Sequence, residues 1–354
     1  MGDIEGFLAI DTAIRNGYGI AVRHLPDEDV LRLTAVGHDA IFTTCDPAEL
    51  NGKEGFVMAP FFASEECPII CMQAQEYELA IPEEAFPAPD GEYPFTRITT
   101  NYPKRFRRFI TPIREGVMDT LMLSRRVEME KPAGFSPSLL FLKACYRNPR
   151  SCVYLVHTPY SGTWLGCSPL PFLFGEGDDW QVSAVGGEQP LINGLVPPVW
   201  TERICDEQQM IADCVQVRLQ ATGLEWRNEP PRAVPVGNVA YLKADFPFTL
   251  PDRDCIGDLL KALYPTPIVC GLPCEDAYRF IIDREGYDRR YYSGFVGYLS
   301  PEGRSEIHLN LRCMEFLSTK LAMYVGSLLL PDSTPAGEWK ETESQISFLR
   351  SFLD

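Results

Sequence analysis

The sequence lacks an excess of positive charge. Its 32 lysine and arginine residues are outnumbered by 49 aspartate and glutamate residues, which gives a formal net charge of −17 and a sequence pI of about 4.7. A field of this sign repels phosphate backbones and anionic lipid headgroups. The composition therefore argues against nucleic acid and membranes as partners.

Long apolar runs and a basic N-terminal segment are also missing. No stretch reaches the roughly 20 residues that cross a bilayer, and residues 1–6 carry acidic residues instead of the positive charges of a signal peptide. We therefore expect a soluble, cytoplasmic protein. Its 12 cysteines are expected to be reduced and mostly buried, because disulfides are rare in that compartment.

Histidine is scarce, and its four occurrences are scattered along the chain. Cys67 and Cys71 have the spacing of half a zinc site, as do Cys270 and Cys274. The first pair borders a strand-like segment that would hold its members roughly 13 Å apart, too far to share one ion. A structural zinc site is therefore disfavoured.

Several nucleotide and hydrolase motifs are absent. No G-x-G-x-x-G follows a strand and no G-x-x-x-x-G-K-[ST] occurs, so the sequence gives no support for dinucleotide binding or P-loop chemistry. The segment G-C-S-P-L at 166–170 lacks the final glycine of a nucleophile elbow. A serine hydrolase is therefore not favoured.

What the chain does have is an ordinary globular composition without linkers. Hydrophobic residues make up 45% of its 354 residues, and no low-complexity tract interrupts them. We predict a single domain over residues 1–354, in which 1–100 is the less characteristic part and 101–354 carries the motifs. Strands should begin the chain, from residue 7 to residue 80.

Hydrophobic periodicity predicts an α+β fold of large antiparallel sheets with helices on their outer faces. The predicted strands are 20–23, 30–36, 40–44, 55–59, 69–72, a strand within 116–129, 153–157, 162–168, 180–190 ending in a Gly-Gly turn, 239–246, 291–299, 307–316 and 322–330. The predicted helices are 102–114, 136–146, 201–222, 255–263, 276–283 and a last one from 335. The basic and aromatic residues of 102–114 are interpreted as two sides of an amphipathic helix.

The last helix carries acidic residues on one face. Ser333 or Thr334 is a candidate N-cap before a proline. Glu338, Glu341 and Gln345 follow at spacings of three and four, which places them one above the other. Such a face is either a solvated acidic surface or part of a Mg²⁺ site, since Mg²⁺ takes one or two carboxylates together with waters and substrate oxygens.

A series of motifs runs in order through the second two-thirds of the chain. They are L-S-R at 123–125, W-L-G-C-S-P at 164–169, W-T-E-R-I-C-D-E-Q at 200–208, P-T-P-x-x-x-G-x-P at 265–273, D-R-x-Y-Y-S-G-x-x-G at 288–297, L-R-C at 311–313 and D-S-x-x-x-x-E-W-x-E-T at 332–342. In this order and spacing they resemble the chorismate-utilising enzymes, and most closely the isochorismate synthases.

The resemblance implies two large antiparallel sheets around a deep cleft. It also implies Mg²⁺-dependent movement of the chorismate hydroxyl to another ring carbon, in menaquinone or siderophore precursor supply, by a protein expected to be monomeric. The implied metal ligands are Glu207, Glu338 and Glu341. The implied substrate-binding residues are Gly187, Tyr292, Arg312 and Gly326.

The sequence departs from the family pattern at positions that carry the chemistry. Thr120 stands where the family has its lysine base, and Leu170 stands where it has its acidic glutamate. Glu188 replaces a threonine, and Leu328 replaces a glycine. Two readings follow: an isochorismate synthase with replacement acid and base groups, or a catalytically inactive homologue with a binding or interaction role. An aminating relative of the anthranilate synthase type is less well supported by the motifs.

Overall fold

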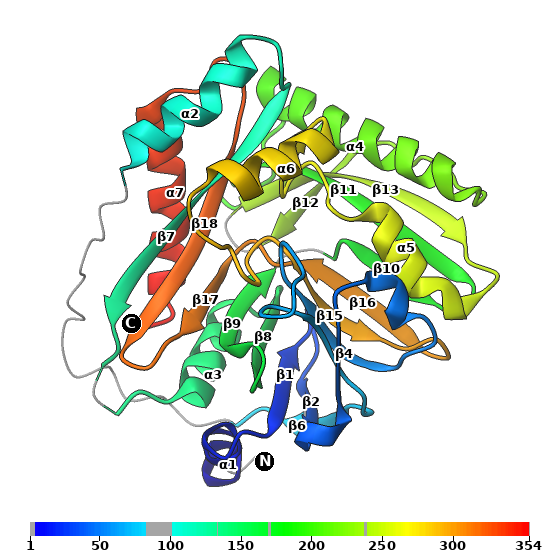
Figure 1. Cartoon of the computed structure of the whole chain (residues 1–354), viewed down its shortest axis with the longest axis vertical. Coiled ribbons are helices and arrows are strands. Elements are labelled where there is room, and N and C mark those ends of the chain that lie inside the picture. The colour runs from blue at the N-terminus through cyan, green and yellow to red at the C-terminus, as the bar shows by residue number, and fades with distance from the viewer. Residues whose placement is uncertain (1–3, 83–100, 133, 169–170, 237–238, 354) are drawn as a thin grey trace.

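Two antiparallel nine-stranded sheets form the body of the protein, as predicted. The computed structural model describes residues 4–82, 101–132, 134–168, 171–236 and 239–353 (Figure 1). The first sheet has the spatial order β14 (Gly271–Leu272), β7 (Thr120–Glu130), β18 (Lys320–Leu329), β17 (Cys313–Phe316), β9 (Gly162–Ser168), β8 (Cys152–Thr158), β1 (Gly19–His24), β2 (Val30–Val36) and β6 (Tyr77–Ala80). The second has the order β12 (Arg232–Val236), β13 (Val239–Thr249), β11 (Asp179–Pro190), β10 (Leu173–Glu176), β16 (Arg304–Leu309), β15 (Phe295–Leu299), β4 (Gly55–Ala59), β5 (Ile69–Met72) and β3 (Ile41–Thr44).

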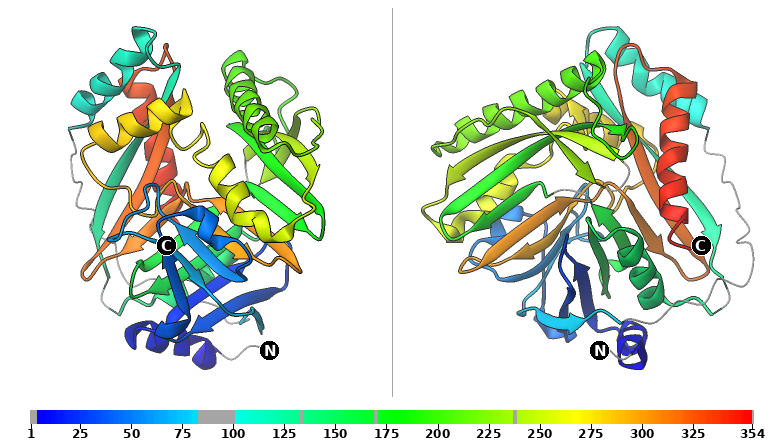
Figure 2. Two further views of the ribbon diagram at one scale, coloured as in Figure 1. Left: turned by 45° about the vertical axis from the view of Figure 1, so that its right-hand side comes forward. Right: turned by 180° about the vertical axis from the view of Figure 1, so that it is seen from behind.

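Helices cover the outer faces of both sheets (Figure 2). In the described residues they are α1 (Ile4–Arg15), α2 (Tyr102–Arg114), α3 (Pro137–Arg147), α4 (Glu202–Thr222), α5 (Ile256–Leu263), α6 (Cys274–Arg284) and α7 (Pro335–Arg350). Apolar side chains of α1, α3 and α7 pack with the first sheet, and those of α4 and α5 pack with the second. No helix in the described ranges combines the length and apolarity needed to cross a membrane.

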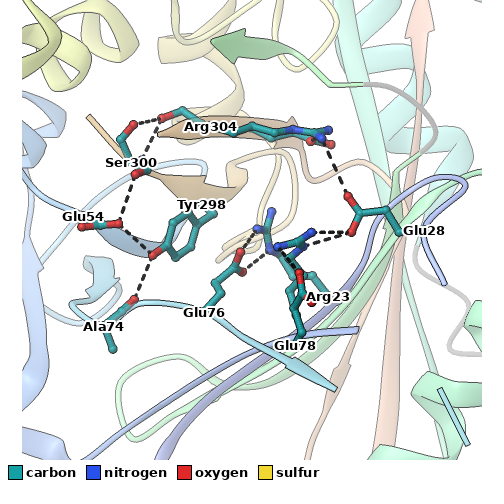
Figure 3. A network of polar contacts seen from close by, with 12 residues as sticks. Arg23, Glu28, Glu54, Ala74, Glu76, Glu78, Tyr298, Ser300 and Arg304 are labelled. Carbon is teal, nitrogen blue, oxygen red and sulfur yellow. Dashed lines mark hydrogen bonds and ion pairs between the residues drawn. The ribbon is translucent and has the colours of Figure 1, made fainter. Parts of the chain in front are cut away.

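The inner faces of the sheets meet around a cluster of aromatic side chains. The Trp164 ring of the first sheet lies 5.3 Å from the Tyr324 ring and 5.7 Å from the Tyr291 ring, and all three residues are buried. Charged side chains also lie between the sheets, where β1 and the segment before β2 meet β15 and β16 (Figure 3). Arg304 of β16 contacts Glu28, which precedes β2, at 3.8 Å. The two sheets are therefore joined by aromatic contacts and by ion pairs between them.

The two helices nearest the later site both have side-chain N-caps, of which the one at residues 333–334 was predicted from the sequence. Thr201 accepts a hydrogen bond from the backbone of Ile204, and Thr334 accepts one from Gly337. Each fixes the first turn of its helix, because it satisfies one of the N–H groups that the helix leaves without a partner.

Four predictions about single elements were wrong. The chain starts with helix α1 instead of a strand, since Phe7 and Ile10 bury one helical face. Residues 291–294 form a turn before β15, because Ser293 has a φ of 66°. The predicted strand 307–316 is two strands in different sheets. The Gly-Gly pair at 186–187 lies inside β11 instead of ending it.

Candidate active site

A cavity of about 640 Å³ lies between β18 of the first sheet and β11 with α4 of the second. All seven residues predicted to bind metal or substrate line it, although they come from segments far apart in the chain. They are Gly187, Glu207, Tyr292, Arg312, Gly326, Glu338 and Glu341. The structure therefore brings the predicted site residues together in one pocket, and their individual roles stay predictions.

Of the two predicted catalytic positions, Thr120 is not part of this lining. Thr120 lies at the start of β7 with 1% of its surface exposed, and its hydroxyl has no hydrogen-bond partner among the described residues. Met122, two residues further on, does line the pocket. Leu170 lies outside the described residues. Thr120 thus brings no proton-accepting group to the pocket.

Glu338 is the most deeply buried carboxylate of the pocket, with 4% of its surface exposed. Its Oε1 accepts a hydrogen bond from Ser333 Oγ at 2.7 Å and lies 3.0 Å from Arg203 Nη2. The sequence analysis missed Arg203. A signal for it existed, because Arg203 precedes Glu207 by four residues on α4 and therefore shares its helix face.

Gln345 fixes the backbone of β18 beside the pocket. Its amide donates to the Gly326 carbonyl at 2.9 Å and accepts from the Gly326 N–H at 3.2 Å. The same amide donates to Glu341 Oε1 at 3.1 Å. The helix face predicted from spacing is therefore real, and its third member holds both the strand and the second carboxylate.

The charge of Glu207 is disfavoured at this place. Burial, together with the nearby carboxylates Glu341, Glu338 and Glu188, raises the pKa of Glu207 to about 7, and Arg203 offsets only part of that rise. The carboxyl is therefore protonated more readily than an ordinary glutamate side chain. An added cation near it would favour its charged form.

Tyr292 and Gly326 meet so closely that only glycine fits on the strand. A Cβ at Gly326 would lie 2.5 Å from the Tyr292 hydroxyl oxygen and 3.0 Å from Met122 Sδ. The turn that carries Tyr292 is fixed by Arg289, which pairs with Glu285 at 2.5 Å. Arg289 also donates to the Met122 carbonyl at 2.8 Å, so the turn is tied to β7 next to the pocket.

Arg312 forms an ion pair with Glu188 at another wall of the pocket. The Arg312 guanidinium lies 5.9 Å from the Tyr241 ring and 5.3 Å from the Phe348 ring. Glu188 reaches it from β11. The acidic residue that departs from the family pattern thus contacts the arginine predicted to bind substrate.

The pocket carboxylates are of the right chemical type to bind Mg²⁺, but they do not form a complete binding site in their present positions. Carboxylate oxygens are the ligands Mg²⁺ prefers, and one or two suffice when waters and substrate complete the shell. In the described residues, however, no three acidic, histidine or cysteine side chains form a group that could hold an ion as they stand. Arg203 accounts for this at Glu338, since its guanidinium occupies one oxygen of that carboxylate.

Comparison with known proteins gives a match in the part of the chain that contains α4 and α7. Residues 201–354 match the model of the family described as chorismate binding enzyme. Isochorismate synthase EntC of Escherichia coli (strain K12) is 24% identical over 243 residues, which are 65% of this chain and 61% of that protein. Isochorismate synthase DhbC of Bacillus subtilis (strain 168) is 24% identical over 262 residues, which are 70% of this chain and 66% of that protein. These alignments span less than two thirds of each relative.

Solved structures share the fold across nearly the whole chain. The menaquinone-specific isochorismate synthase MenF from Escherichia coli superposes with a TM-score of 0.80 at 18% identity, covering 99% of this chain and 91% of that one. Anthranilate synthase component I from Streptococcus pneumoniae TIGR4 has a TM-score of 0.68 at 16% identity, covering 95% of this chain and 90% of that one. At these identities the likeness establishes the architecture of the two sheets and their helices.

Proposed function

We propose, from the premise that residues 201–354 form a chorismate-binding enzyme domain, that the protein binds chorismate and converts it to isochorismate with the help of Mg²⁺. The observation that carries this proposal is the convergence of all seven predicted residues on one pocket. A cavity of about 640 Å³ falls in the range of small-molecule sites.

The two ends of the pocket would bind two different ends of the ligand. Glu207, Glu338 and Glu341 would hold Mg²⁺, and Glu338 would join once Arg203 releases it. The bound ion would supply the positive charge that attracts the ring carboxylate. At the other wall, the Tyr292 hydroxyl, together with Arg312 once Glu188 releases it, would orient the remainder of the ring compound beside the backbone at Gly187 and Gly326.

Turnover is expected to be slow compared with an enzyme that has its full acid and base. The reaction adds water at one ring carbon, removes the hydroxyl from another, and needs a proton accepted and a proton given. A positioned acid or base contributes roughly 10²–10⁴ in rate. Thr120 is buried away from the pocket lining and cannot accept a proton at neutral pH, which supports the second candidate function: chorismate binding without conversion.

Incubation of the purified protein with chorismate and Mg²⁺ tests the first function, with isochorismate followed by chromatography. Product above the uncatalysed rate is expected, and it should fall in Glu341→Gln but not in Glu275→Gln, an exposed acid on α6. Tight Mg²⁺-dependent binding of chorismate without product would contradict the first function and support the second, which is binding without conversion. Absence of both binding and product would contradict the two functions together.

The pathway, the cellular location and the oligomeric state do not follow from the geometry of the pocket. Isochorismate supply for menaquinone or siderophores, a cytoplasmic location and a monomeric state stay predictions of the sequence.

A further inference from the structure

Both arginines that line the described part of the pocket are already paired with pocket carboxylates. Arg203 contacts Glu338, and Arg312 contacts Glu188. Among the described lining residues there is no lysine or histidine, and the carboxylates outnumber the two guanidiniums; they are Glu188, Glu207, Asp332, Glu338 and Glu341. An anionic ligand that enters this lining therefore meets no guanidinium that lacks a resident carboxylate.

A β-bulge in β11 turns Glu188 toward Arg312. Val185 pairs with Lys243 and Glu188 pairs with Tyr241, so three steps along β11 correspond to two along β13. In a regular strand, side chains three residues apart face opposite sides. The extra residue returns Glu188 to the side of Val185, which lines the pocket. The backbone itself therefore aims this carboxylate inward.

The ion pair is partly shielded from water. Side-chain exposure is 19% for Arg312 and 28% for Glu188, and the Phe348 and Tyr241 rings lie near the guanidinium. Removing water strengthens charge-assisted hydrogen bonds. A ligand carboxylate that competes for Arg312 must therefore displace a resident partner that is already held in place.

We infer that Glu188 is a specificity-determining residue whose carboxylate fills, from within the chain, the position at Arg312 that a ligand carboxylate would take. The pocket consequently binds a cyclic dicarboxylate such as chorismate more weakly than it would without Glu188, whereas a cyclic monocarboxylate, whose carboxylate would lie toward a Mg²⁺ held by Glu207 and Glu341, loses nothing at Arg312. A second ligand carboxylate would displace Glu188 and then face it as a like charge. This inference rests on the proposed function, because it assumes a cyclic carboxylate as ligand.

Isothermal titration with two ring compounds in the presence of Mg²⁺ tests the inference. Chorismate carries two carboxylates and shikimate carries one. In Glu188→Gln, chorismate should bind roughly 10- to 100-fold more tightly than in the natural protein, because Arg312 gains a charged partner from the ligand. Shikimate should change by less than about threefold. Glu188→Thr, with a smaller neutral side chain, should give the same shift.

Asp332→Asn is the matched control, because it removes one negative charge from the same pocket without touching the pair. It should alter the affinities for both ligands alike. Melting temperatures establish that each variant is folded before its titration is compared.

The outcomes separate this inference from the proposed function. Equal chorismate affinity in the natural protein and in both Glu188 variants would overturn the inference and leave the proposed function standing. Chorismate binding in the variants alone would support the inference and contradict the proposed function. If the Glu188 variants gained as much affinity for shikimate as for chorismate, the inference would be overturned, since the gain would reflect the lost negative charge alone. If neither the natural protein nor any variant bound chorismate, the inference and the proposed function would both be overturned.

Discussion

Arg203 occupies one oxygen of Glu338, a residue predicted to bind metal. Its guanidinium lies 3.0 Å from Glu338 Oε1, yet its own side chain is 42% exposed. A pair of this kind contributes modestly to folding because water screens it. The residue therefore acts on the pocket through its position, as a resident cation that Mg²⁺ would have to replace.

Replacing Arg203 by glutamine should make the protein respond more strongly to Mg²⁺. Without Mg²⁺, the free energy of unfolding should fall by about 1 kcal/mol, since buried Glu338 loses a partner. With Mg²⁺, the melting temperature of the variant should rise more than that of the natural protein. Arg218→Gln, further along α4, is the control and should leave the Mg²⁺ response unchanged. Equal responses in all three proteins would contradict the role given to Arg203.

At this scale the sequence could predict which residues meet but not how they pair. The spacing of Glu338, Glu341 and Gln345 specified one helix face, and that face is present. The contact of Glu188 with Arg312 depends on a bulge and on two elements 124 residues apart. No periodicity contains such information, because a bulge changes side-chain direction without changing composition.

At the scale of elements, α7 is held on β7 through Arg125. The guanidinium donates to Thr342 Oγ1 at 2.7 Å and to Glu343 Oε1 at 2.8 Å, and it lies 3.5 Å from the centroid of the Trp339 ring. Two motifs that supported the family resemblance, L-S-R and E-W-x-E-T, therefore contact each other. They position the helix from which Glu338 and Glu341 reach the pocket.

Arg125→Lys should lower the free energy of unfolding by about 2 kcal/mol, because a lysine cannot form two directed hydrogen bonds and stack on a ring at once. Urea denaturation measures the change. The neighbouring Arg126→Lys is the control: its side chain is 32% exposed and pairs with Glu128 at 2.8 Å, so it should cost less than about 0.5 kcal/mol. Similar losses in the two variants would argue against a special contact at Arg125.

Elements with strong local signals were predicted closely. The helix at 102–114 and the strands 30–36, 55–59, 69–72 and 162–168 have the predicted bounds. The failures are places where tertiary contacts redirect the chain. Between β16 and β17, the Asn310 side chain donates to the Tyr291 carbonyl and accepts from the Tyr154 hydroxyl, and this buried anchor separates two segments that read as one apolar strand.

At the scale of the whole molecule, the space between the sheets contains a buried ion pair. His308 Nε2 lies 2.8 Å from Glu306 Oε1, and both side chains are at most 5% exposed. Burial alone would lower the pKa of His308, but its neighbours Cys152 and Glu306 outweigh burial and raise it. Burial would raise the pKa of Glu306, but His308, with Arg23 of the first sheet and Arg304, lowers it to about 2.

This pair should make stability depend on pH from both sides. The contribution of His308 is complete below its unfolded pKa of about 6.5 and is lost as pH rises through the raised folded value. The contribution of Glu306 is complete above about 4.5 and is lost as pH falls toward the folded value of about 2. Unfolding at a series of pH values should therefore show a plateau between these limits.

His308→Gln should lower the free energy of unfolding at pH 6 by about 1–2 kcal/mol, because the buried Glu306 carboxylate loses its charged partner at Oε1 while Arg304 still pairs with its Oε2 at 2.6 Å. This loss of free energy should shrink at alkaline pH, because His308 of the natural protein is then neutral as well. His38→Gln, at an exposed position, should change neither value. A loss that stays constant with pH would assign His308 a packing role instead.

The pairing of β7 with β18 also affects how the chain folds while it is being synthesised. Glu128 and Lys320 are neighbours across this ladder and lie 192 residues apart in the chain. At a synthesis rate of about 5–20 residues per second, the first strand waits roughly 10 to 40 seconds on the ribosome for the second. During that interval the apolar residues of β7 lack a long neighbour, and such strands are prone to wrong association. The protein is therefore expected to depend on chaperones while it is being made, more than its finished packing would suggest.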